Sequence, residues 1–522
     1  MNNPPTVDPS REPALAHHPQ PDGVKADSLA ARVLVPTLPA ALILLLGLWR
    51  LDRGMWWDES TTYEVATRDL PNLFRLLHTT DAVHGLYYVL LHGLLPPGAG
   101  DAVMLRLPSL LGMAAAAAGT AAIGRKLAGP AVGLTAGLVL AAMPLATRYA
   151  QEGRSYALVT ATVVCATLLL LRALERPTTG RWTGYAALVV LGTFLHLFVC
   201  LAVCAHGASL LAMRVPRRTL RRWLYAALPG VVGAAVFSVC VRRQAAQVSW
   251  LRRPTWGTVP DLVVQFAGPT ITMTVVTLAI AVCGVWLTGR PVAGSARIRA
   301  FALPWLLLPP GTLLIISLIQ PLYNQRYVLY SLPALALLVA GGLNAMTHTL
   351  AAMPSQLSRR RRTLPNGLLT AMLGASMSAA LFFGQLPTHL WLRSVESRSD
   401  DQTAVARLLG EHGRDGDAMV FVPGTKRGVE YVYRREFAGL NDVLQELSPT
   451  QSATLTGTEV PADKVRPLLD GQHRVWLIER TVRRPDRKPT STAKRTTLRN
   501  DFRLVREETV WGLTVGLYVR KP

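Results

Sequence analysis

The segment Met55-Trp56-Trp57-Asp58-Glu59 combines aromatic and acidic side chains that are suited to chemistry at a membrane surface. Tryptophan side chains favour the interface between a membrane and water. The carboxylates of Asp58 and Glu59 would then lie where a lipid-borne substrate presents its head group. Aromatic neighbours partly desolvate a carboxylate, which raises its pKa and its strength as a general base. Alternatively, Asp58 is a helix cap, since Asp is favoured at that position.

A further carboxylate, Asp81, stands three positions before His84, so both side chains could face one ligand on a helix. With Asp58 they form three potential ligands at loose spacing, which is a weak signal for a divalent metal. Asp81 could equally cap the helix that begins near His84. No Walker or Rossmann loop occurs in the chain. The sequence therefore predicts no metal and no other cofactor, with a divalent ion at these residues as the alternative.

Two polar segments, 148–156 and 321–327, bring arginines next to tyrosines. The guanidinium groups of Arg154 and Arg326 suit a phosphate, because their fork donates two parallel hydrogen bonds. The alternative is that these side chains extend along apolar surface to reach water. These segments are candidate phosphate-binding sites.

The composition indicates a membrane protein. The chain has 522 residues, of which 50% are hydrophobic and 17% charged, and its net charge is +23. A soluble domain typically carries about 25% charged residues. These values exclude a disordered protein, a disulfide scaffold and an ordinary cytosolic enzyme. The basic residues are scattered in short clusters between apolar runs, so no nucleic-acid surface is predicted.

About eleven segments are apolar enough to cross a bilayer, which takes roughly 20 residues. Two of them share one apolar stretch and could form a single kinked span, 184–197 and 198–213. The others are 33–50, 104–124, 131–148, 156–173, 224–241, 268–288, 301–319, 328–348 and 367–384.

The basic connections between these segments predict the orientation. With eleven spans, all five basic clusters fall on one side, which the positive-inside rule makes cytoplasmic. We therefore expect a multi-pass protein of the cell membrane with a cytoplasmic N-terminus and an extracytoplasmic C-terminus. Arg148, Arg154 and Arg326 fall on the opposite side, so topology does not explain them. The clusters lie at 125–126, 172–181, 214–222, 290–299 and 359–362.

The sequence divides into three parts. Residues 1–31 are predicted to be a disordered cytoplasmic tail, 32–384 a membrane domain and 385–522 an extracytoplasmic α/β domain. In the third part we expect a helix at 403–412 and a mobile basic loop at 483–499. Strands are expected at 418–423, 475–479 and 514–519.

The acidic residues of the membrane domain gather in one external loop. Residues 51–103 hold Asp52, Asp58, Glu59, Glu64, Asp69, Asp81 and Asp101, and only three acids lie elsewhere in 32–384. An ion or proton carrier is expected to place carboxylates near the bilayer midplane. The pattern therefore favours an enzyme. A transporter or flippase for lipid-linked sugars is the main alternative, followed by a ligase that moves a whole glycan and by a membrane scaffold.

Four motifs in order carry a family resemblance: Trp57-Asp58-Glu59, Asp81…His84-x-x-Tyr87-Tyr88, the run 151–158 that contains Glu152 and Arg154, and Arg326-Tyr327. The chain resembles the GT-C membrane glycosyltransferases, especially the bacterial branch of the protein O-mannosyltransferase and aminoarabinose-transferase superfamily. The resemblance implies a mostly α-helical GT-C fold with about eleven spans and a small external α/β domain. Where this family often carries His-Pro-Pro, the chain has His84-Gly85-Leu86.

The resemblance also implies an activity. The expected reaction transfers a sugar, mannose or a pentose, from a polyprenyl-phosphate donor to an extracytoplasmic protein, lipid or cell-wall glycan, with inversion. Membrane lipids, the donor and the acceptor are the expected partners. Asp58 is the predicted general base, and Glu59 or Asp81 would orient the acceptor or the sugar. Arg326, with Arg154, would hold the phosphate. The other expected substrate contacts are Glu152, His84, Tyr87 and Tyr327.

Overall fold

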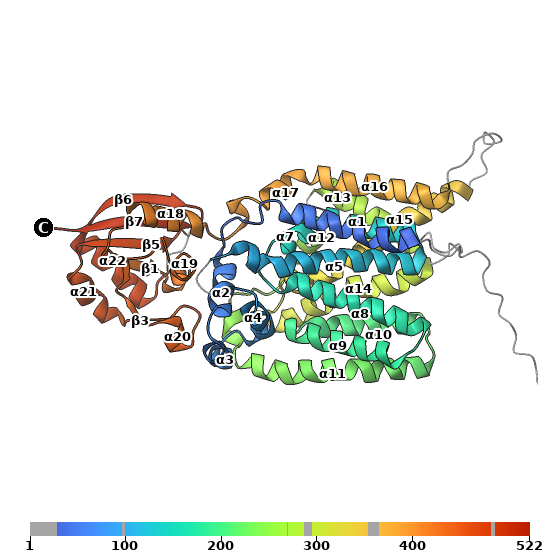
Figure 1. Ribbon diagram of the computed structural model, residues 1–522, viewed down its shortest axis with the longest axis horizontal. Coiled ribbons are helices and arrows are strands. Elements are labelled where there is room, and N and C mark those ends of the chain that lie inside the picture. The colour runs from blue at the N-terminus through green and yellow to red at the C-terminus, as the bar shows by residue number, and fades with distance from the viewer. Residues whose placement is uncertain (1–28, 97–99, 269, 287–294, 353–364, 482–485) are drawn as a thin grey trace, which may run out of the picture.

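The computed structural model describes residues 29–96, 100–268, 270–286, 295–352, 365–481 and 486–522. A bundle of long helices forms the larger part, and a C-terminal α/β region covers one end of it (Figure 1). The predicted tail lies outside the described residues except for 29–31, which open the first helix. The basic run 359–362 lies outside them as well.

Each predicted span falls on a helix or on a bent pair of helices in the bundle. These elements are α1 (Leu29–Leu48), α5 (Ala102–Ala128), α6 (Pro130–Ala142), α7 (Pro144–Ala150), α8 (Tyr156–Glu175), α9 (Thr179–Leu195), α10 (Val199–Ala212), α11 (Arg217–Arg242), α12 (Thr258–Ala267), α13 (Ile271–Trp286), α14 (Ser295–Ile319), α15 (Leu332–Ala352) and α16 (Asn366–Gly384). Two short 3₁₀ helices accompany them, η2 (Ala245–Val248) and η4 (Gln325–Ser331).

By length and composition, seven of the described helices can cross a membrane, and up to nine spans result if each bent pair counts as one. The two predicted spans that this test leaves out are α9 and α10, with 17 and 14 residues. Both lie along the bundle axis in Figure 1, and α9 packs on α8 and α11 while α10 packs on α14. They are therefore two separate helices and not one kinked span.

Small residues let α5 and α6 approach closely. A Cβ atom added to Gly124 would lie 2.9 Å from the Cα of Gly133, and one added to Gly133 would lie 2.5 Å from the Ala121 carbonyl oxygen. Larger side chains at these positions would push the helices apart, which is why membrane helix interfaces are rich in glycine and alanine. This contact fixes α5, which carries Arg106 toward the site.

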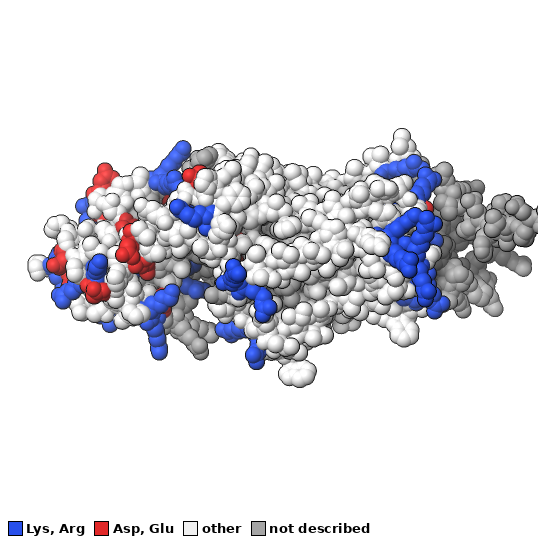
Figure 2. Space-filling model, turned by 90° about the horizontal axis from the view of Figure 1, so that it is seen from below, with Lys and Arg blue, Asp and Glu red and all other residues white. Residues whose placement is uncertain are grey.

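Basic side chains gather at the end of the bundle away from the C-terminal region (Figure 2). A broad band almost free of charged side chains separates them from the other end of the molecule. Exposed arginines at the start of α11 belong to the basic end, Arg217, Arg218 and Arg221. The arrangement has the form expected of a chain that crosses a bilayer.

The acidic loop folds into short helices between the bundle and the C-terminal region. Asp69 and Asp101 cap α3 and α5, because their carboxylates accept hydrogen bonds from backbone amides of the first turn. Asp58 and Asp81 make no such cap. The helices are α2 (Trp57–Ala66), α3 (Leu70–Thr79), η1 (Ala82–His84) and α4 (Gly85–His92).

The C-terminal region contains a five-stranded sheet in the order β2-β1-β5-β7-β6. Strands β2, β1 and β5 are parallel, and β7 is antiparallel to β5 and β6. The strands are β1 (Ala418–Val422), β2 (Asn441–Asp442), β5 (Arg474–Arg480), β6 (Phe502–Val510) and β7 (Leu513–Arg520), and a separate pair is β3 (Gln445–Leu447) with β4 (Thr458–Glu459). The helices are α17 (Leu386–Trp391), η5 (Val395–Ser397), α18 (Gln402–His412), η6 (Gly424–Arg427), α19 (Gly428–Val432), α20 (Pro449–Ser452), α21 (Ala462–Asp470) and α22 (Pro489–Asp501).

The three predicted strands and the predicted helix 403–412 are confirmed by β1, β5, β7 and α18. The predicted loop 483–499 is wrong over 489–499, because α22 covers these residues. Pro489 opens this helix, where its missing amide hydrogen costs nothing. Ser491, Lys494 and Leu498 recur at helical spacing and are buried against the sheet side of the region. Residues 483–485 lie outside the described part of the chain.

Buried charges hold the C-terminal region together. Arg427 is 1% exposed and is hydrogen-bonded to Asp442 and Glu459, and Lys494 donates to the Phe421 carbonyl at 2.8 Å and to Glu459. Glu430 lies beside this cluster, and its Oε2 has no hydrogen-bond partner among the described residues. Burial, reinforced by Asp442 and opposed by Arg427, raises the pKa of Glu430 to about 7.

This raised pKa predicts a pH-dependent stability. Because folded Glu430 holds its proton above the ordinary carboxyl pKa, its contribution is complete below about pH 4.5 and is lost as the pH rises through 7. Glu430→Gln should therefore stabilise the chain by about 1–3 kcal/mol at pH 8 and change little at pH 5. Thermal unfolding of the full chain at both pH values measures this, with the exposed Glu446→Gln as the control. Equal effects of Glu430→Gln at the two pH values would contradict the prediction.

Candidate active site

A cavity of about 1100 Å³ lies where the bundle end meets the C-terminal region. The bundle side consists of the start of α2, η1, the α7–α8 connection, and the segments 247–250 and 324–327. The C-terminal region supplies the opposite wall. Seven of the nine predicted site residues line this cavity, Asp58, Asp81, His84, Glu152, Arg154, Arg326 and Tyr327. The structure thus brings together residues that are up to 269 positions apart in the sequence.

Asp58 occupies the first turn of α2 and points into the cavity. Its side chain is 20% exposed, and its Oδ2 accepts a hydrogen bond of 3.0 Å from Nη1 of Arg326. An acid in the first helical turn is favoured by the positive end of the helix dipole. The predicted base and the predicted phosphate ligand are therefore an ion pair in the same cavity.

Arg326 is surrounded by aromatic rings. Its guanidinium carbon lies 5.4 Å from the ring centroid of Tyr156, 5.6 Å from that of Trp250 and 5.8 Å from that of Tyr327. Such contacts hold a guanidinium by cation–π attraction and leave its N–H groups free to donate. The Nε of Arg326 has no hydrogen-bond partner among the described residues. This side chain is thus held in place with donors to spare.

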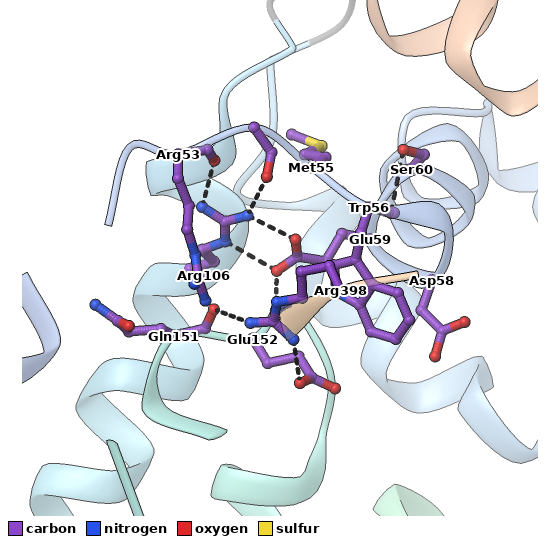
Figure 3. A network of polar contacts seen from close by, with 12 residues as sticks. Arg53, Met55, Trp56, Asp58, Glu59, Ser60, Arg106, Gln151, Glu152 and Arg398 are labelled. Atoms are coloured by element: carbon purple, nitrogen blue, oxygen red, sulfur yellow. Dashed lines mark hydrogen bonds and ion pairs between the residues drawn. The ribbon is translucent and has the colours of Figure 1, made fainter. Parts of the chain in front are cut away.

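Glu59 does not line the cavity. Its side chain has no exposed surface and forms two hydrogen bonds with Arg106, of 2.8 and 2.6 Å, while the Gly153 amide donates to it at 2.8 Å (Figure 3). Burial alone would raise the pKa of Glu59, but the Arg106 guanidinium outweighs it and lowers the pKa to about 2. The structure therefore does not support the predicted contact of Glu59 with acceptor or sugar, and we assign it a positioning role.

Arg106 extends this ion pair to the backbone. Its Nη1 donates to the carbonyl oxygens of Leu51 and Arg53, each at 2.6 Å, and its Nη2 donates to that of Gly54 at 3.0 Å. These bonds tie the end of the first connection to α5 just before α2 begins. Asp58 points away from this network (Figure 3), because adjacent residues of a helix are turned by about 100°.

Asp81, His84 and Arg154 form a connected group on the cavity wall. Arg154 donates to Nε2 of His84 at 2.7 Å and to the Thr62 hydroxyl at 3.0 Å, and Tyr88 donates to Asp81. Burial raises the pKa of Asp81 although Arg154 opposes it. Burial and then Arg154 lower the pKa of His84 well below its usual value. His84 is accordingly neutral, and its proton lies on Nδ1, because Nε2 accepts from an arginine.

The Nδ1 of His84 has no partner among the described residues, so it can donate a hydrogen bond to a ligand. Asp81 has a left-handed backbone conformation, with φ at 61°, and its carboxylate accepts a hydrogen bond from Tyr88. The Asp81 Oδ1 lies 3.9 Å from Nε2 of His84. No group of three or more His, Cys, Asp or Glu side chains in the described ranges is arranged to hold a metal ion.

Tyr87 is placed differently from the sequence expectation. Its side chain is 1% exposed in the core of the bundle end and does not line the cavity. His84, at the end of η1, lines the cavity, whereas Tyr87, in the first turn of α4, is enclosed by the core. The predicted substrate contact of Tyr87 is therefore not supported by its position.

Glu152 lines the cavity and joins the two parts of the molecule. Its Oε2 accepts a hydrogen bond of 2.7 Å from Nη1 of Arg398, and the Nε of Arg148 lies 3.9 Å from the same oxygen. Arg398 precedes the C-terminal sheet, and its guanidinium lies over the Trp56 ring (Figure 3). Glu152 thus links the α7–α8 connection to the segment that precedes the C-terminal sheet.

Sequence reasoning missed the residues that the C-terminal region contributes. Asp400 is 2% exposed, and it accepts one hydrogen bond from the Trp57 amide at 3.1 Å and another from Lys426. The Nζ of Lys426 lies 5.3 Å from the Trp57 ring centroid and lines the cavity. These contacts hold the start of α2 and hence Asp58. No local pattern marks the contacts of Trp57 with this region, because they join segments more than 300 residues apart.

The cavity wall is positively charged. Its six cationic residues outnumber three acids, Asp58, Asp81 and Glu152. An excess of cations in a concave site raises the local concentration of anionic ligands. The cations are Arg148, Arg154, Arg326, Lys426, Arg480 and Lys488. The arrangement suits a substrate that carries a phosphate.

Comparisons with known proteins show a partial family match and a similar fold. Residues 98–241 match the model of the dolichyl-phosphate-mannose-protein mannosyltransferase family. No curated protein matches the chain by sequence. The crystal structure of ArnT from Cupriavidus metallidurans bound to undecaprenyl phosphate matches with a TM-score of 0.57 and 15% identity, over 94% of this chain and 98% of ArnT.

Two further solved structures are similar. ArnT from the same organism in the apo state has a TM-score of 0.57 and 15% identity, over 92% of this chain and 97% of that chain. The arabinofuranosyltransferase AftD from Mycobacteria has a TM-score of 0.45 and 16% identity, over 93% of this chain and 40% of that chain. The ArnT matches span nearly the whole of both chains, so the shared fold includes the C-terminal region. The chain therefore has the GT-C fold of the membrane glycosyltransferases, as its motifs predict, and its segment 98–241 matches the mannosyltransferase family within it.

Proposed function

We propose that this protein transfers a sugar from a polyprenyl-phosphate donor to an extracytoplasmic acceptor, with inversion at the anomeric carbon. The observation that carries the proposal is the Asp58–Arg326 pair in a positively charged cavity at one end of an apolar bundle. ArnT, which shares the fold, binds undecaprenyl phosphate. Mannose or a pentose is the proposed sugar, and the acceptor is a protein, a lipid or a cell-wall glycan.

The same proposal assigns an orientation. The basic end of the bundle faces the cytoplasm, in accordance with the positive-inside rule, and the cavity and C-terminal region face outward. The N-terminus is then cytoplasmic. The donor reaches the cavity from the outer leaflet, and its sugar lies above the membrane surface beside Asp58.

In the proposed reaction Asp58 acts as the general base. The acceptor hydroxyl oxygen forms a bond to the anomeric carbon while its proton passes to the Asp58 carboxylate. The bond from the anomeric carbon to the phosphate oxygen breaks on the opposite face, and its electron pair leaves with the polyprenyl phosphate. Arg326 and Arg154 stabilise the charge that develops on the departing phosphate. His84 Nδ1 is placed to donate a hydrogen bond to the sugar or phosphate.

The ion pair between Asp58 and Arg326 adds a coupling between binding and catalysis. A donor phosphate that binds Arg326 replaces the Asp58 carboxylate as its partner. The Asp58 carboxylate is then free to accept the proton of the acceptor hydroxyl.

The proposal is tested by supplying synthetic polyprenyl-phosphate sugars to the purified chain in native-lipid nanodiscs. We expect release of polyprenyl phosphate with the mannosyl or the arabinosyl donor when an acceptor extract is present. If the folded protein consumed neither donor and did not bind undecaprenyl phosphate, the proposed function would be wrong.

Arg326→Ala should weaken the binding of undecaprenyl phosphate by about 10–100-fold, the value of one charge-assisted hydrogen-bonded contact of 1.5–3 kcal/mol. Native mass spectrometry of nanodisc-embedded protein measures this affinity. Arg217→Ala is the matched control, because Arg217 is an exposed arginine at the opposite end of the bundle. Unchanged affinity in Arg326→Ala would remove Arg326 from the phosphate site.

A further inference from the structure

A second cavity, of about 280 Å³, lies within the C-terminal region and shares part of its lining with the site already described. It opens where strands β1 and β5 end, and its lining includes Pro423 and Thr425 after β1 and Arg480 at the end of β5. We call it the sheet-edge crevice. Its volume is near the lower limit of about 300 Å³ for small-molecule sites, which is enough for one sugar ring.

The strand order leaves a gap at this position. Strands β1 and β5 are parallel neighbours, paired from Ala418 with Val475 to Val422 with Glu479. After β1 the chain continues to β2 on one side, and after β5 it continues through α22 to β6 on the other side. The connections diverge at this point, which leaves a gap at the carboxyl ends of the two strands. Open α/β sheets bind ligands in such a gap.

The crevice contains two cationic side chains without a hydrogen-bond or ion-pair partner among the described residues. The side chains of Arg480 and Lys488 are exposed, and within the described ranges neither forms a side-chain hydrogen bond or an ion pair. Arg495, by contrast, is paired with Glu479 at 2.6 Å. Arg480 and Lys488 are therefore available to an anionic ligand.

Asp486 is the acid of the crevice, and its carboxylate is already engaged. It accepts hydrogen bonds from the Ser491 hydroxyl at 2.8 Å and the Lys488 amide at 3.2 Å. Partial burial raises its pKa, but these hydrogen bonds and the Lys488 charge outweigh it, so the pKa of Asp486 is lowered. Asp486 thus helps to order the backbone at Lys488 and leaves the cationic side chains free to bind.

The sheet-edge crevice is continuous with the large cavity. Thr425, Arg480 and Lys488 line both. A molecule bound in the crevice through these residues would extend into the cavity that contains Asp58 and Arg326. An acceptor hydroxyl on such a molecule would then meet Asp58 in the cavity where Arg326 holds the donor phosphate.

We propose that the sheet-edge crevice binds the acceptor through an anionic group, a phosphate or a carboxylate on a saccharide, with Arg480 and Lys488 as its ligands. The identification of the ligand as the acceptor rests on the proposed function, whereas the existence of an anion-binding site does not. Arg480 supplies paired N–H donors and Lys488 a mobile point charge, which together suit either oxyanion. Thr425 is placed to donate its hydroxyl to the same ligand.

Calorimetric titration of the full chain in nanodiscs tests the site with three probes: glucose 6-phosphate, glucuronate and glucose. We expect the charged probes to bind and glucose not to bind. Arg480→Gln combined with Lys488→Gln should weaken binding of the charged probes at least tenfold. The matched control is Lys464→Gln with Arg503→Gln, two exposed cations of the same region that line neither cavity. The relative affinities of the phosphate and carboxylate probes identify the preferred oxyanion.

Three results would overturn the inference. The first is that the wild type and the Arg480/Lys488 variant bind the charged probes equally, and the second is that glucose binds as well as its phosphate. The third is that Arg326→Ala alone abolishes binding of the charged probes, which would place them in the large cavity. Undecaprenyl phosphate is titrated in parallel. If the wild type bound the charged probes through Arg480 and Lys488 but did not bind undecaprenyl phosphate, the anion site would stand and the proposed function would fail.

Discussion

Replacing Asp58 by asparagine is expected to reduce sugar transfer by about 10²–10⁴-fold, the usual contribution of a general base. Asparagine keeps the shape of the side chain but cannot accept the proton of the acceptor hydroxyl. Donor affinity should stay the same or rise, because Arg326 loses the carboxylate that it contacts at 3.0 Å. The measurement is the rate of polyprenyl phosphate release, combined with the affinity for undecaprenyl phosphate.

Asp52→Asn is the control for this experiment. Asp52 belongs to the same acidic loop, but it is exposed and does not line the cavity. Its replacement should leave transfer unchanged. If Asp58→Asn transferred sugar at the wild-type rate, another group would have to accept the proton, and Asp81 would be the next candidate because it lines the same cavity.

Replacing Arg106 by methionine is expected to destabilise the protein by about 3–5 kcal/mol, the cost of leaving one partner of a buried ion pair alone. The change would strand the Glu59 carboxylate, which has no exposed surface, and three carbonyl oxygens of residues 51–54. The measurement is thermal unfolding, with the yield of monodisperse protein in detergent as a second readout. Arg217→Met, at an exposed position, controls for loss of an arginine.

The pH dependence and a double variant separate this effect from a general packing defect. Because the pKa of Glu59 is lowered to about 2, its contribution is present above about pH 4.5 and is lost only as the pH falls toward 2. In Arg106→Met, burial is no longer opposed by Arg106 and raises the pKa of Glu59, so the deficit should be smaller at pH 5 than at pH 9. Adding Glu59→Met should recover part of the lost stability, since it removes the unpaired charge. A double variant less stable than the single variant would refute the ion-pair explanation.

The helical architecture could be predicted largely from apolar runs. A run of about 20 apolar residues has few stable alternatives to a helix across a membrane, since backbone groups must be satisfied within the segment. The segments 184–197 and 198–213 left two interpretations open, because both are short. Their packing against different helices decides the matter, and such packing is not encoded in the length of a run.

The candidate site shows where sequence spacing stops being informative. Asp58 and Glu59 are neighbours of the same type, yet one faces the cavity and the other is buried against Arg106. Their roles differ through helix rotation and through a partner 47 positions away. Tyr87, for which the motif predicts a substrate contact, is likewise buried and does not line the cavity. The motifs predict residues that line one cavity, whereas the partners of each side chain distinguish those that face it from those buried behind it.

The contact between Trp57 and Asp400 joins residues 343 positions apart, and Lys426 binds the same carboxylate. During synthesis, α2 emerges long before the segment that contains Asp400. A partly made chain would hold Asp58 without Asp400 to fix the start of α2. Chain order thus delays completion of this cavity wall until the C-terminal region has been made.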